Sequence, residues 1–194
     1  MEIKLYLRML QRGWWLVLLT ILSAVLAALV SSYFATPVFS SSASYIVSPN
    51  PSYLGVEVDY NLIYSLDTLD KRTIITTYAE ILNSPRIISD TIKSIGYTDD
   101  ELSDYTFSAV VFPETNIIDF TVTGPNPETV VLLVNTVGQN AVSYVESLYQ
   151  IYDMGLLDPA SIPTEPIYPQ PVRDASVAAL VGLTLGRQLG NRYY

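Results

Sequence analysis

An uncharged apolar segment runs from Trp14 to Phe34, and it constrains the fold of this chain more than any other feature. Its 21 residues would form a helix roughly 31 Å long, at 1.5 Å per residue, which matches the thickness of a bilayer's hydrocarbon core. A cleaved signal peptide is the alternative, but its apolar region typically has only about 7 to 15 residues. We therefore expect an uncleaved transmembrane helix over residues 14–34.

The charges around this segment predict its orientation. Three basic residues precede it, Lys4, Arg8 and Arg12. The next basic residue is Lys71, so the positive-inside rule places residues 1–13 in the cytoplasm and the following domain outside. Trp14 and Trp15 stand where an aromatic belt would mark the inner membrane interface. The stretch Glu2–Gln11 either lies along the membrane surface or extends the spanning helix.

Composition excludes several classes of function. Among its 194 residues the chain has no cysteine and no histidine, which removes disulfides, thiolate zinc sites, cysteine nucleophiles and the usual triad hydrolases. A formal charge of -9 argues against a nucleic-acid partner, because phosphate binding needs clustered Lys and Arg. Charged residues make up only 15% of the chain, which fits a membrane protein.

Periodicity and turn residues predict a second, α+β region over residues 35–157. Its expected elements are a strand at 38–47, a helix at 65–82, a helix from Pro85 to Gly96, strands at 105–112 and 117–123, a long helix from Pro127, and a strand at 151–157. Ser84 and Asn126 are the expected N-caps of the helices that begin at the two prolines. The order βαββαβ, with a broken first helical region, is characteristic of ferredoxin-like sheets.

The long helix should bury one stripe of side chains, namely Val130, Val134, Val137, Ala141, Tyr144, Val145 and Leu148. The densest group of carboxylates in the chain is the acidic run at residues 99–104. A solvated charge run that starts a helical turn explains these carboxylates better than a metal site does. No pair of carboxylates is placed for glycoside hydrolysis, and we expect no catalytic residue, metal or cofactor.

Residues 158–174 form an expected proline-rich linker. Pro163, Pro166 and Pro169 recur at every third position and Pro171 follows, a spacing that suits a semi-rigid polyproline II segment leading back to the membrane. An SH3-type ligand is the alternative.

A second apolar helix is expected at 175–186, followed by a tail at 187–194. Twelve residues span only about 18 Å, so this membrane helix is expected to be incomplete. Gly182 and Gly186 have the four-residue spacing that lets membrane helices pack closely, although glycines at this frequency are also unremarkable.

Four stretches carry a resemblance to one family. They are Tyr6–Trp15 (YLRMLQRGWW), Pro37–Phe39 with Ser42–Val47, Thr77–Ile88 (TYAEILNSPRII), and Ile117–Thr123 followed by GPNPE. Together with the order of segments, they resemble the chain length determinant family, the bacterial polysaccharide co-polymerases. The strongest match is the helix, break and helix around Ser84-Pro85-Arg86. A plain helix break explains that motif most simply, and a family-specific subunit contact is the alternative.

The resemblance implies a non-catalytic regulator of polysaccharide chain length and export (capsule, exopolysaccharide or O-antigen) in the bacterial inner membrane. Its implied partners are further copies of the chain, the bilayer and the polysaccharide polymerase and export machinery. The compact domain resembles the subgroup that works with a cytoplasmic tyrosine kinase, so an adaptor that recruits or activates such a kinase is the alternative function. A sugar-modifying enzyme is a third class, and the missing His and Cys argue against it.

Charge also bears on assembly. Residues 35–172 carry 17 acidic side chains and four basic ones, which leaves a net charge of −13. Like-charged copies repel, so an oligomer should place Lys71, Arg72 or Arg86 against the acids of a neighbour. The first helix of the domain, with Asp67, Asp70, Lys71 and Arg72, is the candidate contact.

Overall fold

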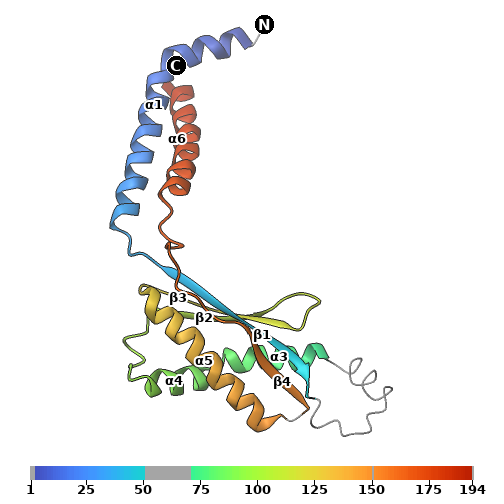
Figure 1. Ribbon diagram of the computed structural model, residues 1–194. Coiled ribbons are helices and arrows are strands. Elements are labelled where there is room, and N and C mark those ends of the chain that lie inside the picture. Colours follow the sequence, from blue (N-terminus) through green and yellow to red (C-terminus); the bar gives the residue numbers. More distant parts are fainter. Residues whose placement is uncertain (1–2, 51–70, 150, 194) are drawn as a thin grey trace. The chain divides into compact units, whose positions relative to one another are not determined.

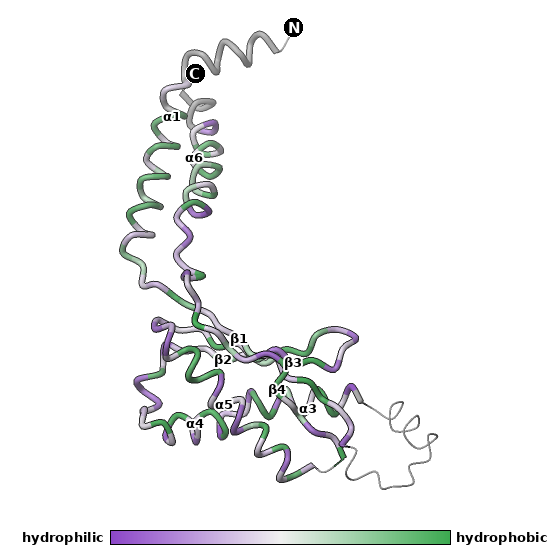
Figure 2. Tube along the Cα trace, in the orientation of Figure 1, coloured by the Kyte–Doolittle hydropathy of each residue, from purple (hydrophilic) through white to green (hydrophobic). Residues whose placement is uncertain are grey.

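The computed structural model describes residues 3–50, 71–149 and 151–193, and it divides into two compact units (Figure 1). The helical unit comprises residues 1–37 and 167–194, and the sheet unit comprises residues 38–166. Figure 2 shows hydrophobic residues along most of the coloured part of the first helix, whereas hydrophobic and hydrophilic residues alternate through the sheet unit. Each unit therefore has its own pattern of hydropathy.

The sheet unit is built on four strands. These are β1 (Phe39–Pro49), β2 (Thr106–Val111), β3 (Ile117–Gly124) and β4 (Tyr152–Asp158). Their order is β2-β3-β1-β4, and all three neighbouring pairs are antiparallel. The central pair aligns Tyr45 with Ile118. The strands and their order along the chain agree with the sequence prediction to within two residues at each end.

Three helices cover one face of this sheet: α3 (Lys71–Leu82), α4 (Pro85–Ser94) and α5 (Pro127–Leu148). The residues of β1 that face these helices are buried, as the alternation of Ala43, Tyr45 and Val47 predicts. Ser42 and Ser48 are exposed on the opposite face. Antiparallel sheets commonly bury one face and leave the other to water, so burying this one face is what stabilises the fold.

Helix α5 begins as the sequence predicts. The Asn126 side chain accepts hydrogen bonds from the backbone N–H groups of Glu128, at 2.9 Å, and Thr129, at 3.2 Å, and Pro127 is the first helical residue. The prediction of its buried stripe was wrong at Tyr144 and Leu148, which are exposed. Leu148 lies on the same side of the helix as the buried stripe, but it is the last residue of α5 and stays exposed to solvent.

Close packing between α5 and β1 depends on a glycine. A Cβ atom on Gly138 would collide with the phenol oxygen of Tyr45 and would lie 2.5 Å from its Cζ. The Tyr45 ring is almost fully buried, and burial raises the pKa of its hydroxyl to about 12. Gly138 was absent from the predicted stripe because its small size gives no hydrophobic signal.

The break between α3 and α4 differs from the prediction in one respect. Ser84 occupies the N-cap position of α4, but its side chain makes no capping hydrogen bond. Its backbone carbonyl accepts from the N–H of Ile88 at 3.1 Å, and Pro85 at the first helical position has no N–H that needs a partner. The expected side-chain cap at Ser84 was therefore wrong.

Asn83 holds this break against the sheet instead. Its Oδ1 accepts from the backbone N–H of Ala109 at 2.8 Å, and its Nδ2 donates to the carbonyl of Ala109 at 3.2 Å. Ala109 lies on β2, an edge strand whose outer backbone groups have no neighbouring strand. One side chain thus closes part of this edge of the sheet.

The end of α4 is closed by its own backbone. Gly96 has φ +85°, the Gly96 N–H donates to Lys93 O and the Tyr97 N–H donates to Ile92 O. This is the Schellman arrangement, which favours glycine because φ is positive. It confirms the helix end predicted at Gly96.

The helical unit consists of α1 (Ile3–Phe34) and α6 (Pro171–Tyr193). Helix α1 continues without a break from Ile3, so it extends the apolar segment toward the N-terminus. Helix α6 is longer than the predicted 175–186 at both ends. It begins at a proline within the expected linker, where the missing N–H costs nothing, and it continues through residues such as Arg187 and Gln188, which favour helices.

Gly182 and Gly186 lie against α1. A Cβ on Gly182 would lie 2.8 Å from the Cα of Ile21, and one on Gly186 would lie 2.9 Å from the Cα of Val17. The Thr20 hydroxyl donates to the carbonyls of Val17, at 2.9 Å, and Gly182, at 3.1 Å. The absence of side chains at these two positions therefore lets the two backbones approach closely.

Candidate functional site

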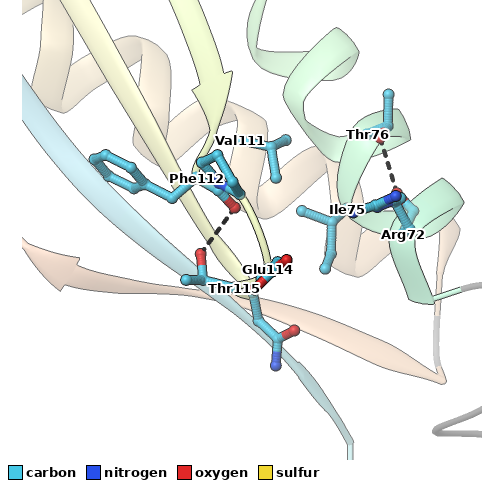
Figure 3. A pocket seen from close by; sticks show the side chains of 9 residues that line it. Arg72, Ile75, Thr76, Val111, Phe112, Glu114 and Thr115 are labelled. Atoms are coloured by element: carbon cyan, nitrogen blue, oxygen red, sulfur yellow. Dashed lines mark hydrogen bonds between the residues drawn. The ribbon is translucent and has the colours of Figure 1, made fainter.

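Helix α3 and the β2–β3 turn form a cleft of about 470 Å³ in the sheet unit (Figure 3). We call it the α3 cleft, and its lining residues are Arg72, Ile75, Thr76, Val111, Phe112, Pro113, Glu114, Thr115 and Asn116. Apolar side chains from α3 and β2 meet polar groups from the turn there. A partly apolar hollow with a few polar groups suits binding.

The turn that forms one wall is fixed by hydrogen bonds. Thr115 donates from its backbone N–H and from its hydroxyl to the carbonyl of Phe112, at 3.3 and 3.1 Å. The carbonyl of Asn116 accepts from the N–H of Val47 at 2.9 Å, which ties the turn to the end of β1. Glu114 has φ +59°, a left-handed conformation that is uncommon outside glycine.

Arg72 carries the positive charge of the α3 cleft. It lies in the first turn of α3, it is exposed, and it forms no ion pair within the described part of the chain. Its backbone carbonyl accepts from the Thr76 hydroxyl at 2.8 Å (Figure 3). Lys71 is the first residue of α3, but its side chain lies outside the description, as do Asp67 and Asp70.

The other motif residues of the α3–α4 region do not converge on this cleft. Arg86 is exposed on α4 and lies 3.8 Å from Asp90, one turn further on, an exposed pair of little energetic weight. Ser84 and Pro85 form the helix junction described above. The structure therefore brings Arg72 to a cleft and leaves Arg86 on an open helix surface.

The predicted membrane residues belong to the helical unit. Trp14 and Trp15 are exposed on α1, Arg8 and Arg12 lie in its first turns, where side chains are not described, and Pro37 is exposed after its last turn. In the part of the chain that the structure describes, one helix contains a stretch long and apolar enough to cross a bilayer, Val17–Phe34 of α1. Hardly any of this stretch is buried, unlike a core helix of a soluble protein.

The predicted linker residues are divided between the units. Pro163 is half-buried and Pro166 is exposed in the sheet unit, whereas Pro169, which follows a cis peptide bond, and Pro171 belong to the helical unit. Residues 159–162 have no regular secondary structure, and the Ser41 hydroxyl donates to the carbonyl of Ser161 at 2.7 Å. Their polyproline II conformation stays a prediction.

Two side chains of the acidic run at residues 99–104 accept hydrogen bonds from neighbouring side chains. Glu101 accepts hydrogen bonds from the hydroxyl and the backbone N–H of Thr98, at 2.5 and 2.8 Å, and these bonds hold the pKa of its carboxyl below its usual value. Asp99 accepts a bond from Ser89 at 3.3 Å. Among the described residues no three acidic side chains are grouped to hold a metal ion.

Sequence reasoning missed the α3 cleft, Asn83 and the role of Thr20. The turn at residues 113–116 was predicted as a connection, but its apposition to the first turn of α3 depends on long-range packing that no local pattern encodes. Asn83 was read only as part of the helix break. The only sequence feature that could have indicated a structural role for Asn83 is its position two residues before Pro85.

The comparisons with known proteins agree with this architecture. A family model described as Wzz, chain length determinant protein, matches residues 1–95. A probable capsular polysaccharide biosynthesis protein of Bacillus subtilis (strain 168), YwqC, is 26% identical over 175 residues, which cover 87% of this chain and 67% of that protein. The capsular polysaccharide biosynthesis protein CpsC of Streptococcus agalactiae is 25% identical over 158 residues, covering 80% of this chain and 65% of CpsC.

This chain thus aligns with about two thirds of the length of those relatives. A solved structure described as a full-length bacterial polysaccharide co-polymerase has a TM-score of 0.56 and 10% identity, over 96% of each chain. At that identity the likeness shows a common fold. The family model, the relatives and the shared fold together confirm that this chain resembles the chain length determinant family of polysaccharide biosynthesis.

Proposed function

We propose that this protein is a non-catalytic regulator of the length and export of a bacterial surface polysaccharide. The observation that carries the proposal is the match of the chain length determinant model to residues 1–95, which include α1, β1, α3 and α4. The two relatives are named as capsular biosynthesis proteins, which favours a capsular or related polymer.

The proposal includes a membrane topology and a fold class. Helix α1 spans the inner membrane with its N-terminus in the cytoplasm, and the short apolar part of α6 packs against α1. Support comes from the basic residues that precede α1 and from the glycine contacts that join α6 to α1. The sheet unit then lies outside, and the order β2-β3-β1-β4 supports its assignment as ferredoxin-like.

The proposed mode of action is assembly. A regulator without a catalytic group has to act through its contacts, with other copies of itself and with the polymerase and export machinery. The net charge of −13 over residues 35–172 opposes self-association, so specific contacts have to offset it. The adaptor role for a cytoplasmic tyrosine kinase stays a prediction from the resemblance.

The test of function is a gene deletion in the organism of origin, with the surface polysaccharide resolved by gel electrophoresis. We expect a changed length distribution that the full-length gene restores. An unchanged distribution would reject the proposed function, and purified chain that cleaves or transfers sugar would reject its non-catalytic character.

The test of topology uses the absence of native cysteine. Single cysteines at the exposed positions Ser42 and Ser103 should react with a membrane-impermeant maleimide in intact cells, whereas one at Glu2 should react only after lysis. The reverse pattern would overturn the orientation.

A further inference from the structure

The described helices leave the second face of the sheet uncovered. We call it the open face, and it consists of the even-numbered residues 40–46 and 106–112 and the odd-numbered residues 117–123, which alternate with the residues turned toward the helices. Two rows of hydroxyl groups cross it. Ser108, Thr121 and Ser42 are neighbours in register on β2, β3 and β1, and Thr106, Thr123 and Ser40 form the next row.

A carboxylate is fixed beside these rows. Asp119 accepts hydrogen bonds from the Ser44 hydroxyl at 3.2 Å and from the Thr121 hydroxyl at 3.4 Å. An ionised carboxylate has about four acceptor positions, so these two bonds leave it able to accept others. The hydroxyls of Ser42 and Ser108 bond to no protein group within the described residues. The open face therefore offers a positioned acceptor among hydroxyls that are available to another molecule.

The end of the open face near the β2–β3 turn is apolar. Ile46 lies opposite Ile117 in register, and the N–H of Phe112 donates to the carbonyl of Ile117 at 3.0 Å, so these three residues occupy neighbouring positions. Figure 3 shows the Phe112 ring directed away from α3, and both Phe112 and Val110 are exposed. A group of exposed apolar side chains with polar groups beside it is typical of a binding surface.

Charge narrows the class of ligand. None of the four described strands contains lysine or arginine. Nucleic acids, acidic polymers and anionic lipid surfaces are bound through clustered cations, and Asp119 would repel them here. A protein partner fits less well, because serine and aspartate are depleted in protein–protein interfaces. The chemistry that matches the open face is a molecule with many hydroxyl groups and no net charge.

An uncharged saccharide has this chemistry. Its hydroxyls both donate and accept hydrogen bonds, as serine and threonine hydroxyls do, and they can donate to a carboxylate. Such bonds replace bonds to water and gain little net free energy, so contact between apolar groups has to supply the rest. The C–H groups of a sugar ring can pack on Phe112, because the face of an aromatic ring carries partial negative charge that attracts them.

We propose that the open face binds an uncharged segment of a saccharide chain, with Phe112 against a sugar ring and Asp119 and the two hydroxyl rows bonded to sugar hydroxyls. The inference rests on the proposed function and deepens it, because a regulator of polymer length would then contact the polymer itself. Successive side chains on one face of a strand lie about 6.6 Å apart, and neighbouring strands lie about 4.8 Å apart. The rows therefore offer a chain of sugars repeated contacts along the sheet.

Protection of single cysteines tests the location, since the chain has no native cysteine. The full-length chain in detergent micelles carries Ser42→Cys or Ser108→Cys on the open face, or Ser143→Cys on the exposed surface of α5 as the control. Uncharged oligosaccharides prepared from the cell's own surface polysaccharide should slow the reaction with a maleimide several-fold at the first two positions and leave the third unchanged. Equal rates with and without saccharide would overturn the proposal. So would a rate that falls as the protein concentration rises without saccharide, because a second copy would then cover the face.

Affinity measurements test the two kinds of contact. Phe112→Ala and Asp119→Asn should each weaken binding of the same oligosaccharides several-fold in equilibrium dialysis. Phe112→Tyr keeps an aromatic ring and should retain the affinity, which separates loss of the ring from loss of folding. Tyr144→Ala is the matched control, since it removes an exposed aromatic side chain from α5, and it should bind as the parent chain does. Unchanged affinity in Phe112→Ala and Asp119→Asn, or tighter binding of acidic fragments than of uncharged ones, rejects the proposal.

Failure of this site can be told from failure of the proposed function. Unprotected cysteines at Ser42 and Ser108 reject the saccharide contact even where the deletion strain has altered polymer lengths. Normal polymer lengths in the deletion strain reject the proposed function, even where the oligosaccharides bind.

Discussion

The two units of this protein both depend on glycine, but they use it against different neighbours. In the sheet unit Gly138 makes room for the phenol of Tyr45, so a small residue allows a large one to be buried. In the helical unit Gly182 and Gly186 make room for the backbone of α1 itself. The first is the packing of a core that excludes water, and the second is the packing of helices whose outer surface remains apolar and exposed.

The proposed membrane topology accounts for this difference. Burial of apolar side chains drives folding in water, so the sheet unit places Phe120, Ile118 and Val122 at complete burial between the strands and helices. Between helices in a bilayer that driving force is weak, and close backbone contact with an interhelical hydrogen bond, such as that from Thr20 to Gly182, takes its place. Variants should therefore affect one unit without the other.

The largest effect is expected from Phe120→Ala in the sheet unit. Its ring is fully buried and stacks on Phe107 with a centroid separation of 6.5 Å, so the substitution should lower the free energy of unfolding of the sheet unit by about 3–5 kcal/mol. Urea titration followed by circular dichroism measures it, because both tryptophans lie outside this unit. Contact between α1 and α6 should be unchanged, and its loss would show that the units do not stabilise independently.

The converse variant is Gly182→Ile. Its side chain would meet Ile21 Cα, Thr20 O and Ala24 Cβ, so the helices have to separate. Cysteines at Ala24 and at Ala178, one turn before Gly182, should crosslink within the parent chain and several-fold less in the variant. The matched control is Leu183→Ile, at the adjacent exposed position, which should crosslink normally. A fall in the unfolding free energy of the sheet unit would contradict the separation of the two packing modes.

A smaller effect within the sheet unit compares neighbouring residues at the helix break. Asn83→Ala removes two hydrogen bonds and leaves the backbone of Ala109 without those partners, which should cost about 1–3 kcal/mol. Ser84→Ala removes no capping bond and should change stability by less than about 0.5 kcal/mol. Equal losses in the two unfolding titrations would mean that Ser84 does act as a cap.

The same pair illustrates how far sequence patterns reach. The strands, the helix break at Pro85, the cap at Asn126 and the helix end at Gly96 were predictable, because each depends on residues a few positions apart. Asn83, Gly138 and the α3 cleft were not, since their partners lie 26 residues or more along the chain or face a turn whose position only the packed sheet determines. The predicted limits of α6 were too narrow because they followed hydropathy alone, although polar residues also form helices.

The smallest expected effect concerns Glu101, where the sheet unit relies on a local polar contact at its surface. The bonds from Thr98 depress the pKa of the folded carboxyl, so their stabilisation is present above the unfolded pKa of glutamate, about 4.3, and is lost as pH falls through the lower folded value. Urea midpoints from pH 6 to pH 3 should therefore decline less steeply in Glu101→Gln, because glutamine keeps the capping bond without titrating. The difference should be small because the carboxyl is fully exposed to solvent. Identical pH profiles would mean that the Thr98 contact contributes nothing to stability in solution, and that the sheet unit depends on its buried contacts alone.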